Sequence, residues 1–385
     1  MIKRQIAEEL TATAREFPVV TITGPRQAGK TTLARMHFPD YAYANLEAPE
    51  VRLLATSDPN AFFSQFPEPL IIDEIQRVPE LLSSIQARAD NSQKRGQYIL
   101  TGSHQTRLHE AVTQSLAGRT AILRLLPLSL EELKAAGIVH NRDELIYRGF
   151  MPRLYGENVE PTRLYRNYLQ TYVERDVRQM VNVKDLVEFE NFMRLLAGRV
   201  GQVLNLSSLA NDLGVSSTTL KEWLSVLEAS YLIFRLNPYF ENIGKRVIKS
   251  PKLYFTEIGL ASYLLGIEGA GMAERDPLRG NLFENMVVIE ALKARLNAGR
   301  EPELYFYRDN KGNEIDILLR KNRTLIPIEV KSAMTFNREF TKGITYFQKI
   351  YPSAQDGYII YAGELTPTLD RARVVHFADT AAVFS

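Results

Sequence analysis

A segment close to the N-terminus restricts the fold of this chain more than any other part of it. The residues "VVTITGPRQAGKTT" (19–32) open with β-branched side chains, run through Gly24 and four further residues to Gly29, and lead into helix-forming sequence. A strand, a glycine-bounded loop and a helix in this order match the spacing G-x-x-x-x-G-K-[ST]. The glycines let backbone N–H groups turn toward phosphate oxygens, and the start of the helix adds partial positive charge. The segment therefore predicts a triphosphate-binding loop in an α/β fold.

The side chains of this loop have expected parts in binding the nucleotide. Lys30 would bring a full positive charge to the phosphates, and Thr31 would place its hydroxyl on Mg²⁺. A glycine-bearing surface turn is the alternative, which the ordered flanking sequence disfavours. We expect ATP or GTP to bind, with ATP and Mg²⁺ the predicted cofactors, through the loop residues Gly24, Pro25, Arg26, Gln27, Ala28, Gly29, Lys30, Thr31 and Thr32.

Two acidic residues follow the next apolar segment. Residues 70–72 are typical of a buried parallel strand, which ends at Asp73 and Glu74. Ligands of such sheets bind beyond the carboxyl ends of the strands, which would bring both acids beside the phosphates. Asp73 would then hold the Mg²⁺, and Glu74 would polarise the attacking water. The alternative is a charged helix N-terminus, where acids favour the helix dipole.

Polar residues also follow the next two expected strands. The strand in "GQYILTGSH" ends in Thr101 and Ser103, and either could touch the γ-phosphate as a polar sensor; we favour Ser103. Arg119 lies after a glycine and before another strand. Hydrolysis in this class is accelerated when an arginine, often from a neighbouring subunit, reaches the γ-phosphate. Arg119 is the candidate, and a solvated arginine at a helix end is an equal alternative.

The motifs taken together resemble a known family. The segments "GPRQAGKTTLAR", "NLEAPEVR", "LIIDEIQRVPELLSSIQ", "YILTGSHQ", "GRTAILRLLPLSLEEL" and "GFMPRLY" are similar to those of bacterial and archaeal AAA-type ATPases that carry a C-terminal domain similar to PD-(D/E)XK nucleases. The resemblance implies an AAA-type core with a small lid in residues 1–158. It also implies a homo-oligomer, in size a hexamer, whose nucleotide sites lie between subunits.

The middle of the chain, 159–272, is expected to hold a linker helix and a winged-helix domain. In the linker helix, Arg175 and Arg178 either reach a neighbouring nucleotide or pair with nearby acids. A helix from Ser208, a turn at Gly214 and a helix capped near Ser216 or Ser217 match a helix-turn-helix. The second helix offers Ser217, Thr218, Thr219 and Lys221 to DNA bases, and the wing would meet phosphates through Lys245, Arg246, Lys249 and Lys252. Packing against a protein partner is the alternative use.

The last part of the chain, 273–385, carries the pattern "LIPIEVKSAM", in which Glu329 and Lys331 share one face of an expected strand. The ordinary interpretation is a half-buried strand with one solvated face. Upstream, however, Glu284 lies near the start of an expected amphipathic helix, and Asp316 lies on the second strand of a hairpin turning at 309–312. A second hairpin through "RKNRT" would bring Asp316 beside Glu329.

This order of helix glutamate, aspartate and E-x-K is the PD-(D/E)XK constellation. Mg²⁺ or Mn²⁺ would be held by Asp316 and Glu329, with help from Glu284 and the Val330 carbonyl. Lys331 would orient the attacking water or meet the phosphate. Glu314 is an alternative to Asp316, and Ile315 stands where the family name has proline. A fold that has kept these residues but lost catalysis is the alternative.

Composition limits the remaining choices. With 385 residues, 45% apolar and 24% charged, no cysteine and a net charge of +2, the chain reads as a multidomain globular protein of the cytoplasm without membrane contact. Any DNA surface must be a local patch. The leading hypothesis is an oligomeric ATPase that moves on DNA and cuts it, with branched or junction DNA as substrate. The alternatives are a nucleotide-controlled switch that binds protein or nucleic acid without cleaving it, and a winged-helix regulator.

Overall fold

The computed structural model describes the chain except for residues 1, 93, 104–114, 174–185 and 240–249. The chain folds into two compact units. Unit 1 comprises Met1–Leu128, Ala229–Tyr231 and Leu296–Arg300, and unit 2 comprises Ser129–Glu228, Leu232–Arg295 and Glu301–Ser385. Strands on both sides of the expected boundary at residue 272 belong to one sheet, and the three expected domains stay a prediction.

Unit 1 is built on a five-stranded parallel sheet. Its strands run in the order β2 (Ala42–Asn45), β3 (Leu70–Asp73), β4 (Tyr98–Gly102), β1 (Val19–Thr23) and β5 (Thr120–Arg124). The expected α/β architecture with a parallel sheet is therefore confirmed. Because β1 is parallel to its neighbours β4 and β5, the loop after it opens at the carboxyl edge of the sheet, where β3 and β4 also end.

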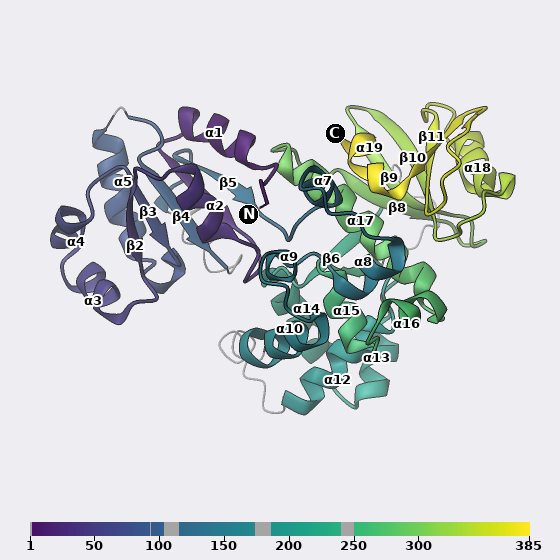
Figure 1. The fold of residues 1–385 in the computed structure, drawn as a ribbon, viewed down its shortest axis with the longest axis horizontal. Coiled ribbons are helices and arrows are strands. Elements are labelled where there is room, and N and C mark those ends of the chain that lie inside the picture. Colours follow the sequence, from purple (N-terminus) through teal and green to yellow (C-terminus); the bar gives the residue numbers. More distant parts are fainter. Residues whose placement is uncertain (1, 93, 104–114, 174–185, 240–249) are drawn as a thin grey trace. The chain divides into compact units, whose positions relative to one another are not determined.

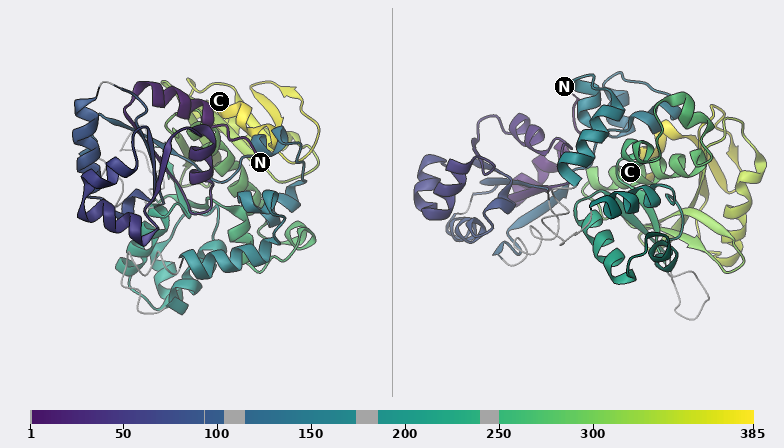
Figure 2. Two further views of the ribbon diagram at one scale, coloured as in Figure 1. Left: turned by 60° about the vertical axis from the view of Figure 1, so that its left-hand side comes forward. Right: turned by 90° about the horizontal axis from the view of Figure 1, so that it is seen from below.

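Helices cover both faces of this sheet (Figure 1). On one face, α1 (Ala7–Glu16) and α2 (Lys30–His37) contribute Leu10 and Leu33 to a core shared with Val20 and Ile22. On the other face lie α3 (Pro49–Ser57), α4 (Pro59–Gln65) and α5 (Leu81–Asn91). The layered arrangement is visible from two further directions in Figure 2.

Unit 2 begins with helices and continues into the expected helix-turn-helix. The first helices are α7 (Leu130–Ala135), α8 (Arg142–Arg148), α9 (Pro152–Gly156), α10 (Pro161–Tyr168), a π-helical turn (Leu169–Val173) and α12 (Leu186–Ala197). In the next pair, α13 (Leu206–Leu213) ends at Gly214 with φ 69°, and α14 (Ser217–Ala229) is capped by Ser216, whose Oγ accepts from Thr219 N–H at 3.1 Å. Arg175, Arg178, Lys245, Arg246 and Lys249 lie outside the described residues.

An eight-stranded sheet forms the rest of unit 2. Its order is β12 (Thr368–Leu369), β13 (Ala372–His376), β11 (Gly357–Tyr361), β10 (Thr324–Lys331), β9 (Glu314–Lys321), β8 (Leu304–Arg308), β6 (Ile233–Pro238) and β7 (Lys252–Phe255). The strands β8, β9 and β10 form the two expected antiparallel hairpins. The pair β6–β7 that follows the helix-turn-helix joins this sheet, because β6 is parallel to β8.

Helices α15 (Ile258–Leu264), α16 (Ala270–Arg275), α17 (Arg279–Asn297), α18 (Lys342–Ile350) and α19 (Thr380–Phe384) complete unit 2 and correct two expectations. The helix α17 is not amphipathic, since most residues from Leu282 to Arg295 are buried on all sides. Strand β10 has no solvated face up to Val330, because α18 packs Ile344 and Phe347 against the side that bears Leu325 and Glu329. Among the described helices, none is both long and apolar enough to cross a membrane.

Candidate nucleotide site and acidic cluster

The loop after β1 has the backbone that its glycines predict. Gly24 has φ +149°, and a Cβ built on it would lie 2.0 Å from the carbonyl oxygen of Leu125. Gly29, at φ +93°, leads into α2. Both conformations are ones that residues with a side chain rarely adopt. The loop therefore holds its shape only with glycine at these two positions.

An arginine that the sequence reasoning missed braces this loop from outside the motif. The guanidinium of Arg4 is buried and donates to the carbonyl oxygens of Ala28 at 2.7 Å and Leu126 at 2.6 Å. It thus links the loop to the segment after β5. No local pattern marks Arg4 for this part, because its partners are 24 and 122 residues away in sequence.

Lys30 lies inside the loop. Its side chain is 6% exposed, and its Nζ donates to the carbonyl oxygens of Gly24 at 3.0 Å and Pro25 at 2.8 Å. The ammonium is therefore already at the loop that is expected to wrap the phosphates, and a lysine so placed binds phosphate as a point charge.

Asp73 is held by three hydroxyl groups at the end of β3. Thr31 donates to Oδ1 at 2.8 Å, Thr101 donates to the same oxygen, and Tyr43 donates to Oδ2 at 3.0 Å. The structure thus brings Thr31 and Asp73 together as expected, while Thr101 supports Asp73 instead of facing a phosphate. Burial and the carboxylate of Asp73 raise the pKa of Tyr43, so this phenol stays a donor. Tyr43 was missed, although its strand β2 neighbours β3.

Glu74 and Ser103 also lie together. Glu74 has the left-handed backbone φ 59°, ψ 45°, which few residues other than glycine adopt, and such conformations gather at functional sites. Its carboxylate accepts from Gln76 and, at 3.4 Å, from the hydroxyl of Ser103. Gln76 in turn donates to Ser103 at 3.2 Å. The expected water-polarising acid and polar sensor therefore form one cluster next to Asp73.

Arg119 is held within unit 1. Its guanidinium makes two hydrogen bonds to the carboxylate of Asp90, at 2.5 and 3.0 Å. These hydrogen bonds raise the pKa of Arg119. A role for Arg119 at another subunit's nucleotide would require this pair to open, and that role stays a prediction.

A hollow of about 510 Å³ adjoins Thr31 and Tyr43, the two hydroxyl donors to Asp73 that lie on α2 and β2. Thr31, Arg35 and Tyr43 line it, and the guanidinium of Arg35 lies 4.7 Å from the centre of the Tyr43 ring.

In unit 2, the hairpins bring the expected nuclease residues together. Asp316 Oδ2 accepts the backbone N–H of Val330 at 2.8 Å and lies 3.5 Å from Lys331 Nζ, which also pairs with Glu329. Burial and the charge of Asp316 raise the pKa of Glu329 to about 8, against the opposing effect of Lys331. Burial would also raise the pKa of Asp316, but Lys331 and Lys252 outweigh it and lower that pKa.

Glu284 and Glu314 extend this acidic cluster and share one lysine. Lys252 Nζ lies 2.9 Å from Glu284 Oε1 and also pairs with Glu314, and Tyr254 donates to Glu284 at 2.6 Å. The expectation that Lys252 meets DNA phosphate is therefore wrong, because its side chain is 2% exposed and bound to two carboxylates. Arg308 reaches Glu314 at 3.4 Å from the outer side.

The acidic cluster does not fit a divalent ion as it stands. Within the described ranges of the chain, no three or more His, Cys, Asp or Glu side chains are grouped so as to hold a metal. The carboxylates of the cluster are instead interleaved with the ammonium groups of Lys252 and Lys331. The nucleotide site differs, since the carboxylate of Asp73 accepts from the hydroxyl groups of Thr31, Tyr43 and Thr101, and oxygen atoms are the ligands that Mg²⁺ prefers.

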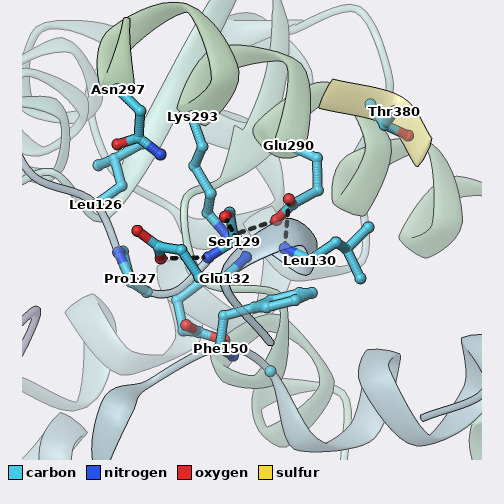
Figure 3. A network of polar contacts seen from close by, with 12 residues as sticks. Leu126, Pro127, Ser129, Leu130, Glu132, Phe150, Glu290, Lys293, Asn297 and Thr380 are labelled. Carbon is cyan, nitrogen blue, oxygen red and sulfur yellow. Dashed lines mark hydrogen bonds and ion pairs between the residues drawn. The ribbon is translucent and has the colours of Figure 1, made fainter. Parts of the chain in front are cut away.

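A second buried charge network in unit 2 was not expected from the sequence (Figure 3). From α17, Glu290 accepts the N–H of Leu130 at 2.8 Å and pairs with Lys293, whose ammonium lies 4.0 Å from the centre of the Phe150 ring. Glu290 thereby holds the first residue of α7 on α17. Glu257, which is distant in sequence from these residues, is also buried. Its carboxylate accepts from Phe150 N–H and from the hydroxyl of Tyr165, each at 2.9 Å.

A groove of about 880 Å³ runs between the helix-turn-helix and the sheet of unit 2. Its cations are Lys221 on α14, Arg235 on β6 and Arg308 at the end of β8, and its described lining contains no carboxylate. Hydroxyl and amide groups of Asn205, Ser207, Ser225 and Ser250 add hydrogen-bonding capacity. The groove therefore presents three cationic side chains and neutral donors on one surface, which are groups that phosphate oxygens can contact. Two of the cations, Arg235 and Arg308, also pair with Glu228 and Glu314.

Three family models match the chain. Residues 16–134 match the model described as an AAA domain, residues 139–271 a domain of unknown function (DUF8612), and residues 279–379 a second domain of unknown function (DUF4143). The front of the chain is thus an AAA-type ATPase domain. The descriptions of the other two families assign no activity, so the winged-helix and nuclease-like domains stay predictions.

Relatives cover most of the chain. The uncharacterized protein Rv2008c of Mycobacterium tuberculosis is 30% identical over 336 residues, which are 86% of this chain and 74% of that protein. An uncharacterized protein of Haemophilus influenzae is 24% identical and covers 86% of this chain and 87% of its own length. Among solved structures, the Walker-type ATPase PABY2304 of Pyrococcus abyssi aligns with a TM-score of 0.45 and 14% identity, over 68% of this chain and 94% of that one.

Proposed function

The chain belongs to the family of the mycobacterial protein Rv2008c and contains an AAA-type ATPase domain, and we propose that ATP binding and hydrolysis in this domain switch the nucleic-acid binding of unit 2. One observation carries the ATPase half of the proposal. Thr31, on the helix after the glycine loop, donates at 2.8 Å to Asp73, and Glu74 follows Asp73 at the same sheet edge.

Each residue of the nucleotide site has a part that follows from its position. A bound Mg²⁺ would supply positive charge that neutralises the charge developing on the phosphates. Thr31 and Asp73 would hold that ion, and Lys30 would bind phosphate oxygens in place of its two loop carbonyls. Glu74 would orient the attacking water, while Ser103 and Gln76 hold its carboxylate in place.

The groove of unit 2 supports the nucleic-acid half. Its three cations and four neutral polar residues would contact the phosphodiester backbone, without the fixed pairing that base readout requires. Lys221 also lies on α14, the helix that the sequence predicts to face DNA. DNA bound through its backbone is therefore the partner that this surface fits best.

Binding to fluorescent DNA tests both halves together. We expect single-stranded, duplex or four-way-junction DNA to bind with an affinity that differs between ATP, ADP and nucleotide-free protein. In Lys221→Ala and Arg235→Ala, the slope of log K against log salt should fall by about 0.7–0.9 for each lost phosphate contact. Lys349→Ala, an exposed lysine outside the groove, is the matched control and should keep the slope. Equal DNA binding in all nucleotide states would refute the switch.

A metal-dependent nuclease coupled to a DNA motor is the second candidate. The observation that favours it is the convergence of Asp316, Glu329 and Lys331 on neighbouring strands. Incubation with Mg²⁺ or Mn²⁺ and linear, single-stranded or junction DNA tests it. Cleavage that is lost in both Asp316→Ala and Glu329→Ala would support the nuclease, and binding without cleavage would support the switch.

Assembly completes the proposal. In a cytoplasmic homo-oligomer, Arg119 of one subunit would leave Asp90 and reach the γ-phosphate held by the next. Sedimentation in ATP and in ADP would show whether nucleotide sets the assembly state. Arg119→Ala should then slow hydrolysis without weakening ATP binding.

A further inference from the structure

We propose that the ammonium group of Lys252 takes the place of a divalent ion in the acidic cluster of unit 2, so that this domain works without a metal. The inference goes beyond the proposed switch and does not depend on the ATPase site. It separates the switch from the nuclease by the chemistry of one buried side chain.

Lys252 is enclosed among carboxylates and an aromatic ring. It opens strand β7 at the edge of the eight-stranded sheet, and its side chain is 2% exposed. Its Nζ lies 2.9 Å from Glu284 Oε1, pairs with Glu314, and lies 5.6 Å from the centre of the Phe306 ring. A lysine so enclosed, with carboxylates on two different elements, bridges them as a small cation would.

The carboxylates of the acidic cluster are already paired with cationic side chains. The cluster contains four carboxylates, Glu284, Glu314, Asp316 and Glu329, and three cations, Lys252, Arg308 and Lys331, in direct ion pairs with them. The ammonium groups of Lys252 and Lys331 already pair with all four carboxylates, so a divalent ion added among them would lie close to like charge, which repels strongly in a poorly solvated place. The ion could enter only if Lys252 left, which would break two buried ion pairs.

Without a metal ion, the acidic cluster lacks the group that activates water for phosphodiester hydrolysis. Metal-dependent phosphodiester hydrolysis uses the ion to lower the pKa of water and to neutralise charge on the phosphoryl group. An ammonium held between two carboxylates does neither, because it binds no water as a Lewis acid. The acidic cluster is then a structural link between α17, β7 and β9, and DNA that reaches it stays intact.

Manganese binding to the nucleotide-free protein, followed by electron paramagnetic resonance, tests this inference. Wild type and Asp316→Asn should bind equal amounts of Mn²⁺, because the cluster takes none. Lys252→Ala should gain one Mn²⁺ per chain, and Lys252→Ala with Asp316→Asn should lose it again. Lys221→Ala removes the same charge from an exposed position and should gain nothing.

Two results would overturn the inference. One is Mn²⁺ bound by wild type and lost in Asp316→Asn, and the other is a folded Lys252→Ala protein that gains no Mn²⁺. If Lys252→Ala does not fold, the comparison of wild type with Asp316→Asn decides alone. Since nucleotide is absent, loss of the proposed switch would appear in the DNA-binding measurements and leave this result unchanged.

Discussion

Asp73 in unit 1 is buried and Asp316 in unit 2 is partly buried, and each belongs to an expected catalytic site, but the groups that contact the two carboxylates differ in kind. Hydroxyl groups of Thr31, Thr101 and Tyr43 donate to Asp73. The ammonium of Lys331 and the backbone N–H of Val330 contact Asp316. A hydroxyl orients a carboxylate without cancelling its charge, whereas an ammonium cancels it. The carboxylate of Asp73 therefore keeps a negative charge that can bind a cation, whereas the negative charge of Asp316 is already neutralised by Lys331.

The largest expected effect is on ATP hydrolysis at the nucleotide site of unit 1. Glu74→Gln removes the base that orients water and should lower the rate of ATP hydrolysis by about 10²–10⁴-fold with ATP binding kept. Lys30→Ala should weaken ATP binding as well. Hydrolysis is measured by phosphate release and binding by a fluorescent ATP analogue. Glu80→Gln, an exposed acid before α5, is the control and should hydrolyse ATP normally.

Breaking the charge balance of unit 2 should have the next largest effect, on stability. Lys252→Ala leaves Glu284 and Glu314 without their shared cation and should cost about 3–5 kcal/mol of unfolding free energy in urea. The double variant Lys252→Met with Glu284→Gln should be more stable than Lys252→Ala, because neither replaced side chain carries a charge and one fewer carboxylate is left without a cation. Lys221→Ala should stay within about 0.5 kcal/mol of wild type. An unchanged midpoint for Lys252→Ala would mean that the lysine does not hold the cluster.

The hydroxyl of Tyr43 allows the contribution of a single donor to Asp73 to be measured. Tyr43→Phe removes one donor from Asp73, a hydrogen bond to a charged group with a net value of about 1.5–3 kcal/mol. We expect a higher Mg²⁺ concentration for half-maximal hydrolysis, with little change at saturating Mg²⁺. Tyr41→Phe, in the same hollow, should behave as wild type. Equal Mg²⁺ dependence in both variants would show that Tyr43 does not position Asp73.

Glu257 supplies the smallest effect and a third kind of environment, a carboxylate held by uncharged donors deep in unit 2. Burial raises its pKa, against Lys293, Phe150 N–H, Gly259 N–H and Tyr165. A raised pKa favours the protonated folded state, so its stabilisation is full below the ordinary pKa and lost as pH rises through the raised value. Glu257→Gln should therefore flatten the fall of unfolding free energy from about pH 4.5 upward. An unaltered pH slope would contradict this.

The parts of the fold that local sequence encodes were predictable. The spacing from Gly24 to Thr31, the acids after β3 and the turn at Gly214 each depend on neighbouring residues, and the structure has them as expected. Arg4, Tyr43 and Lys252 were missed or misjudged because their partners are distant in sequence. For Lys252 the basic surroundings in sequence suggested a surface loop, whereas its place on β7 beside β6 buries it.

The pairing of β6 with β8 has a consequence for any attempt to dissect the protein. The two family matches meet between residues 271 and 279, yet β6 lies before that junction and β8 after it. A fragment ending there would leave Asn237 and Pro238 of β6 without their partners on β8, and an unpaired strand edge is a template for pairing with other chains. The two separated fragments should therefore aggregate, while a fragment of residues 129–385 should stay in solution.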